Sequence, residues 1–164
     1  MAEEERRVWL EEAMNRWETS LLRLCFAYLG DRALAEDAVQ ETFLKAWKGY
    51  ARFRGEADEK TWLSRIAMNT CKDMRRSAWF RHIDRSAALD SLPEGSVPFE
   101  EVDNAVTRAV MALPEKLREA ALLRWLHGLS GDETAMALRV PRSTVYHRLK
   151  KAQTLLKREL EGLE

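Results

Sequence analysis

Residues 129–149 read LSGDETAMALRVPRSTVYHRL, and this stretch predicts a helix, a tight turn and a second helix. Ser130 and Glu133 have the spacing of a capping box at the start of the first helix. Pro141 stands where the second helix would begin, a position that tolerates a missing N–H. The stretch is therefore typical of a helix-turn-helix.

The second helix of this stretch has one packed face and one polar face. Apolar residues recur at helical spacing from Val145 through Leu149 to Leu160, and His147 and Lys150 fall on the other side. Between residues 139 and 158 there are seven Lys or Arg and no acid, which indicates a surface for phosphate. The alternative is a basic helix that docks on an acidic protein surface. The candidate DNA contacts are Arg142, Ser143, Thr144, His147, Arg148, Lys150 and Lys151.

Length and composition allow one domain or two small ones in 164 residues. Acids and bases balance at 27 each, so only their distribution is informative. Cys25 and Cys71 form no paired motif, which excludes a zinc site built from cysteine alone and predicts two buried thiols in a reducing cytosol. The acidic N-terminus is not a signal peptide, and no apolar run approaches the ~20 residues that span a bilayer. We expect a cytoplasmic protein without membrane insertion.

Helical patterns cover residues 5–29, 31–50 and 61–79. In the second of these, a polar face opposite the apolar one contains an isolated leucine. Its residues are Asp37, Gln40, Glu41, Leu44 and Lys48. An apolar centre with a polar rim is typical of a partner surface, although single exposed leucines are also common.

A second candidate DNA surface combines a loop and the helix after it. In the loop, Phe53 stands between two arginines, where it would either stack on an unpaired base or fill the edge of the core. In the helix, residues 65, 69, 72 and 76 stack as one stripe in which an amide lies among three cations. The candidate set is Phe53, Arg54, Lys60, Arg65, Asn69, Lys72 and Arg76.

Residues 86–105 contain two prolines, a glycine and five acids without a base, which predicts an acidic, flexible linker. Helical patterns return over 106–127, broken at Leu113-Pro114 and ended by Gly128. Their packed side is expected to be Leu117, Ala121, Leu122 and Trp125. No segment alternates like a strand. We therefore predict an all-α fold of two small helical domains, 1–85 and 106–164, each marginal alone and flexibly joined.

Three blocks in this order resemble bacterial sigma factors of the extracytoplasmic-function type. Residues 35–47, AEDAVQETFLKAW, resemble region 2.2, which in that family binds the clamp helices of the largest RNA polymerase subunit. Residues 53–56 and 61–69, FRGE and TWLSRIAMN, resemble regions 2.3 and 2.4, which open and read the minus-ten promoter element. Residues 112–119, ALPEKLRE, together with the helix-turn-helix, resemble region 4, which reads the minus-thirty-five element.

The resemblance implies a non-catalytic factor that needs no cofactor. Its partners would be core RNA polymerase, through the clamp helices and the flap, promoter DNA, and an anti-sigma factor. Arg139 replaces the glycine usual in the turn, so it must accept an unusual backbone angle or change the turn. Gly131 and Thr134 replace an aromatic and an aliphatic residue, which would loosen the first helix. His147 and Lys150 occupy positions that would set promoter choice.

Two other functions are compatible with parts of the pattern. A stand-alone helix-turn-helix regulator would carry a ligand pocket or a dimer face in residues 1–85. A helical metalloenzyme would use clustered acids such as Glu36, Asp37 and Glu41. A divalent metal needs more ligands than these, and the three histidines, His82, His127 and His147, show no ligand spacing, so no metal site is predicted.

Overall fold

The computed structural model describes residues 2–53, 58–80 and 104–162, and these residues form helices with no strand among them, which confirms the all-α prediction. Arg54 lies outside the described residues, as does the expected linker apart from residues 104 and 105, which begin α5. The helices are α1 Ala2–Leu29, α2 Arg32–Gly49, η1 Tyr50–Arg52, α3 Glu59–Phe80, α5 Asn104–Met111, α6 Glu115–Ala121, η3 Leu122–Leu126, α7 Gly131–Leu138 and α8 Arg142–Glu161.

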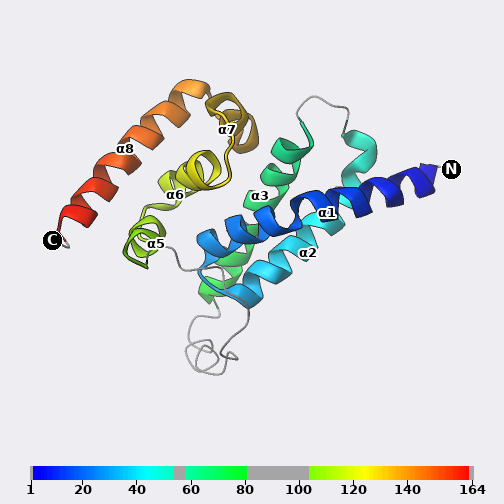
Figure 1. Ribbon diagram of the computed structural model, residues 1–164, viewed down its shortest axis with the longest axis horizontal. Coiled ribbons are helices and arrows are strands. Elements are labelled where there is room, and N and C mark those ends of the chain that lie inside the picture. Colours follow the sequence, from blue (N-terminus) through cyan, green and yellow to red (C-terminus); the bar gives the residue numbers. More distant parts are fainter. Residues whose placement is uncertain (1, 54–57, 81–103, 163–164) are drawn as a thin grey trace.

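Helices α1, α2 and α3 form one bundle (Figure 1). Gly30 ends α1 at φ 72°, a backbone angle that suits glycine. Asp31 then caps α2 by accepting a bond from the Leu34 N–H at 3.0 Å. Inside the bundle, the thiols of Cys25 and Cys71 are both free and buried, which confirms the prediction for them. A hydrogen bond with Cys71, in which the neutral Cys25 thiol takes part, and burial raise the pKa of Cys25.

Helices α5 to α8 form the second domain, with a small core of its own between α6 and α8. The capping box is present: Glu133 N–H donates to Ser130 Oγ at 3.0 Å and Ser130 N–H donates to Glu133 Oε1 at 2.8 Å. Arg139 follows α7 at φ 56° and ψ 46°, so of the two outcomes expected for it the chain adopts the unusual, left-handed backbone angle. Thr134 is fully buried, and its hydroxyl donates to the Ser130 carbonyl at 2.8 Å. The hydroxyl group, at the position where the resemblance implies an aliphatic residue, is therefore hydrogen-bonded although it is buried.

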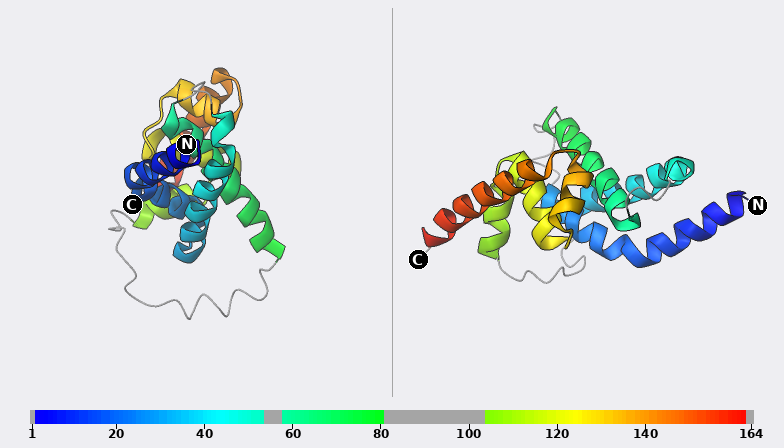
Figure 2. Two further views of the ribbon diagram at one scale, coloured as in Figure 1. Left: turned by 90° about the vertical axis from the view of Figure 1, so that its right-hand side faces the viewer. Right: turned by 90° about the horizontal axis from the view of Figure 1, so that it is seen from above.

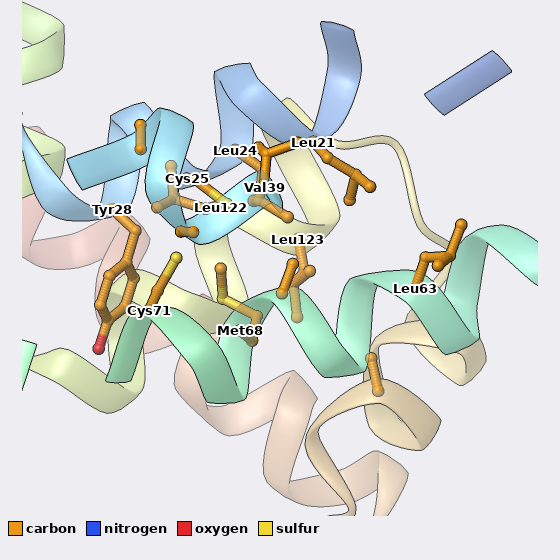
Figure 3. Close-up of a cluster of buried hydrophobic side chains, with 14 of the residues drawn as sticks. Leu21, Leu24, Cys25, Tyr28, Val39, Leu63, Met68, Cys71, Leu122 and Leu123 are labelled. Carbon is orange, nitrogen blue, oxygen red and sulfur yellow. The ribbon is translucent and has the colours of Figure 1, made fainter. Parts of the chain in front are cut away.

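The two domains also share a core. Leu122, Leu123, Leu129 and Ala137 of the second domain belong to the same buried cluster as the inner faces of α1, α2 and α3. Figure 3 shows Leu122 and Leu123 among Leu24, Val39 and Met68. A domain of about 60 residues buries too little apolar surface to be robust by itself, and joining the two cores reduces that deficit.

One packing prediction is wrong. Trp125, expected on the packed side with Leu117, Ala121 and Leu122, is 46% exposed. The cause is a π turn in η3, where the His127 N–H donates to the Leu122 carbonyl at 2.8 Å, five residues back. In this wider turn Leu122 and Leu123 are buried, whereas Trp125 faces outward.

Polar contacts also join the domains. Arg118 donates to the carbonyl of Tyr28 at 3.2 Å, and the Tyr28 hydroxyl donates to Glu115 at 2.8 Å. His127 is buried with Nε2 2.7 Å from the hydroxyl of Ser64. Burial, with a smaller contribution from the charge of Lys60, lowers the pKa of His127 to about 4.

Figure 2 shows α5 to α8 against the side of the α1–α3 bundle, with the start of α1 and the end of α8 at opposite ends. Among the helices described, none has the length and apolarity that crossing a membrane requires.

Candidate nucleic-acid interface

Helix α8 presents the polar face that the sequence predicts. Val145 and Ala152 are buried, whereas Ser143, His147, Lys150 and Lys151 are exposed. Arg142 pairs with Asp132 of α7, with Nε and Oδ1 3.2 Å apart, and Thr144 is half-buried. The exposed side chains are free to approach a groove of duplex DNA.

Sequence reasoning missed Tyr146 on this helix. Its side chain is 60% exposed, its ring lies edge-on to His147, and the Lys150 ammonium is 5.7 Å from the ring centroid. Helical spacing contained the signal, because residue 146 falls outside the stripe of Val145 and Leu149.

Two members of the α3 stripe are open to solvent and two are engaged by the second domain. Asn69 and Arg76 are exposed. Arg65 donates to the Met136 carbonyl at the end of α7, at 2.7 Å and 3.2 Å. Lys72 forms an ion pair with Glu119 of α6, with 2.6 Å between Nζ and Oε2. Arg148 of α8 reaches the other oxygen of Glu119 at 3.8 Å.

The structure does not bring Lys60 to this stripe. Lys60 lies in the first turn of α3, and its ammonium is 5.6 Å from the ring centroid of Trp17 on α1. At 100° per residue, position 60 is far around the helix from position 65, so it points toward α1 instead.

Phe53 lies in an aromatic cluster. Its ring stacks on Trp62, with centroids 4.7 Å apart and planes at 14°, and Trp9 is 6.4 Å away. Of the two roles that the sequence left open, this arrangement matches the one at the edge of the core.

A cavity of about 550 Å³ lies between α2, α3 and α7 beside Phe53. Cations from three helical segments and an aromatic floor line it, and no acid does. The lining residues are Lys45, Gly49, Arg52, Phe53, Trp62, Arg65, Ile66, Asn69, Met136 and Arg139. Basic groups beside aromatic rings suit single-stranded nucleic acid, in which phosphates alternate with stacking bases.

The polar face of α2 is exposed as the sequence predicts, with Asp37, Gln40, Glu41 and Lys48 around a Leu44 that is 47% exposed. Helix α1 extends this face, because Arg7 and Leu10 line one shallow groove together with Gln40 and Leu44. Sequence reasoning did not include the α1 residues, since periodicity within one helix does not say which helix lies beside it.

The clustered acids give no metal site within the described ranges. No three His, Cys, Asp or Glu side chains of these ranges lie together where they could hold a metal ion. Glu36 instead pairs with Arg32 one turn away, with 2.9 Å between Nε and Oε1.

Comparisons with known proteins match both domains. The family model for Sigma-70 region 2 matches residues 13–81, and the model for Sigma-70, region 4, matches residues 103–163. The RNA polymerase sigma-H factor of Pseudomonas aeruginosa is 30% identical over 162 residues, which cover 90% of this chain and 84% of that protein. The ECF RNA polymerase sigma-E factor of Escherichia coli is 34% identical over 141 residues, which cover 77% of this chain and 74% of that protein.

Solved structures share the fold. The sigma factor RpoE in complex with the anti-sigma factor NepR, from Bartonella quintana, superposes with a TM-score of 0.73 at 23% identity, covering 92% of this chain and 96% of that one. CnrH in complex with the cytosolic domain of CnrY gives 0.71 at 22% identity, covering 93% and 88%. With helical domains that match regions 2 and 4 in order, and relatives that span most of its length, this chain belongs to the extracytoplasmic-function sigma factors of the sigma-70 family.

Proposed function

We propose that this chain binds core RNA polymerase and directs promoter-specific initiation. In this proposal α3 and the segment around Phe53 read and melt the minus-ten element, and α8 reads the minus-thirty-five element. The observation that carries it is a pair of basic helical faces on separate domains, each with an exposed polar side chain, Asn69 on α3 and His147 on α8. An amide and an imidazole can read base edges while neighbouring cations contact phosphates.

The polymerase contact is assigned to the α2 face. Leu44 supplies an apolar centre, and Asp37, Gln40, Glu41 and Lys48 supply a polar rim, which is the composition of a protein interface. We assign this face to the clamp helices and the second domain to the flap. The factor would act in the cytoplasm, where it meets polymerase and promoter, and would need neither catalytic residues nor a cofactor.

An anti-sigma factor is a further proposed partner. The solved sigma factor RpoE that shares this fold is in complex with the anti-sigma factor NepR, and CnrH is in complex with the cytosolic domain of CnrY. A partner that covered the α3 stripe or the α2 face would block initiation.

Transcription with purified components tests this function. The chain and core polymerase would be mixed with a genomic DNA library, and run-off products would be sequenced. Defined start sites that require the chain are the expected result. A chain that shifts duplex DNA tightly by itself and adds no start sites to core polymerase would instead be a stand-alone helix-turn-helix regulator.

A further inference from the structure

One buried carboxylate joins the two candidate DNA surfaces. Glu119 on α6 is 3% exposed. Its Oε2 lies 2.6 Å from Lys72 Nζ on α3, and its Oε1 lies 3.8 Å from Arg148 on α8. In the proposed function, Lys72 lies on the helix that reads the minus-ten element and Arg148 lies on the helix that reads the minus-thirty-five element. A single acid therefore pairs with one cation from each surface.

The chemistry of this contact is that of a phosphate contact. A carboxylate offers two anionic oxygens to the same ammonium and guanidinium groups that bind phosphate oxygens. Desolvation favours the neutral form of Glu119 and raises its pKa, while Lys72 and then Arg148 favour its charged form. A buried anion of this kind depends on its cations.

The second domain engages the α3 stripe at another point as well. Arg65 donates twice to the Met136 carbonyl near the end of α7, where carbonyls carry partial negative charge. Arg65 and Lys72 are thus held by the second domain, whereas Asn69 and Arg76 between and beyond them stay exposed. The second domain therefore contacts the cations of the α3 stripe that lie nearest to α6 and α7.

This arrangement is incompatible with the simultaneous use of both surfaces on a promoter. The two elements are centred roughly 25 base pairs apart, which is about 85 Å of duplex at ~3.4 Å per base pair. Lys72 and Arg148 both lie within 4 Å of one side chain. The domains must therefore separate before both elements can be read.

We infer that Glu119 is an internal substitute for DNA phosphate, which holds the free chain in a closed arrangement and must release Lys72 and Arg148 before promoter binding. The inference rests on the proposed function, because it needs both cations to bind DNA. It implies that part of the free energy of DNA or polymerase binding is used to break this contact.

Glu119→Gln tests the inference, because it removes the charge and keeps the shape. Two quantities would be measured without polymerase: hydrogen exchange of the α3, α6 and α7 amides, and affinity for a labelled 20-base-pair duplex by fluorescence anisotropy. Exchange should rise along the contact between domains, and duplex affinity should increase about tenfold, the change expected for freeing a charged contact.

Glu159→Gln is the matched control, because it removes the same charge from an exposed site on α8. It should leave exchange unchanged and alter duplex affinity much less. If folded Glu119→Gln matches Glu159→Gln in both measurements, Glu119 does not hold the domains closed. If exchange rises without a gain in duplex affinity, the two cations are not DNA contacts, which overturns the inference and also the residue assignments of the proposed function.

A second measurement needs no variant. Saturating duplex DNA added to the unmodified chain at low salt should compete with Glu119 and reduce exchange protection around Ser64 and His127, which meet across the same contact. Protection that DNA leaves unchanged, although the DNA binds, would overturn the inference.

Discussion

At the scale of single residues, replacing Asn69 tests whether this side chain reads a base or has only a structural role. It is exposed in the middle of the α3 stripe and lines the basic, aromatic cavity beside Phe53. A side-chain amide has donors and an acceptor for the edge of an unpaired base, and extruding that base costs a few kcal/mol that such contacts must offset. Asn69→Ala should lose open complexes and keep polymerase binding and upstream DNA contact.

Permanganate footprinting of unpaired thymines measures this at limiting polymerase. Asn15→Ala is the control, because Asn15 is also an exposed amide on a helix, α1, away from the cavity. Normal melting by Asn69→Ala would remove Asn69 from the site and leave it with a local role worth a few tenths of a kcal/mol.

At the scale of helices, the α2 face should determine polymerase affinity. Joint replacement of Asp37, Gln40 and Leu44 by alanine should weaken core polymerase binding about thirtyfold, since central interface anchors are typically worth ~2 kcal/mol or more. All three side chains are exposed, so the fold should persist in circular dichroism. Affinity equal to that of the unmodified chain would disprove the assignment of this face.

Helix α8 should separate base contacts from phosphate contacts. His147→Ala and Lys150→Ala should each change preference in the upstream element by ~1–3 kcal/mol at one position and leave the downstream element unaffected. Lys157→Ala should weaken binding to all sequences alike, because a phosphate contact carries no base code. Competition binding of holoenzyme to promoter libraries measures both effects, and equal shifts by all three variants on every promoter would contradict this view of α8.

Some features of the helices could be predicted from the sequence, and others could not. The capping box at Ser130 follows from residues a few positions apart, so local pattern was sufficient. The left-handed backbone of Arg139 is one of the two outcomes that the resemblance implied. The outward turn of Trp125 was not predictable from a 3.6-residue period, because one π hydrogen bond at Leu122 changes the register. The polar faces of α2 and α8 were predictable because exposure follows from helical spacing.

At the scale of the whole molecule, the contacts between domains left no sequence signal. Glu119 pairs with a lysine many residues earlier in the chain, and Lys60 turns to Trp17 instead of joining the α3 stripe. Both depend on how helices from separate domains or bundle positions pack, which composition and periodicity do not specify. The shared core of Leu122, Leu123 and Leu129 with α1–α3 has the same origin.

The free energy of unfolding should decrease as the pH is lowered, because of His127 in the contact between the two domains. The pKa of His127 is about 4 in the folded chain, against an ordinary value of 6.5. Between these values the unfolded state binds a proton that the folded state does not, so the free energy of unfolding decreases as pH falls from 6.5 toward 4, by up to ~1.4 kcal/mol per pH unit. His127→Gln should flatten this dependence.

Urea unfolding of both proteins across this range measures the difference. The raised pKa of Glu119 acts in the opposite direction, because it lowers stability as the pH rises above the ordinary pKa of a glutamate. Both proteins contain Glu119, so its effect cancels in the difference between their slopes. His147→Gln, at an exposed site, is the control for loss of an imidazole. Equal slopes for His127→Gln and the unmodified chain would show that folding does not lower the pKa of His127.

The shared core also sets an order of events during synthesis. Cys71 is among the last core residues of the α1–α3 bundle, and Leu129, which helps to cover that bundle, follows much later in the chain. At about 5–20 residues per second, a ribosome needs roughly 3 to 12 seconds to make the intervening segment. For that interval the nascent bundle carries a bare apolar face, the kind of surface that chaperones bind and that aggregates when left uncovered. The core of the α1–α3 bundle can therefore be completed only after the second domain has been synthesised.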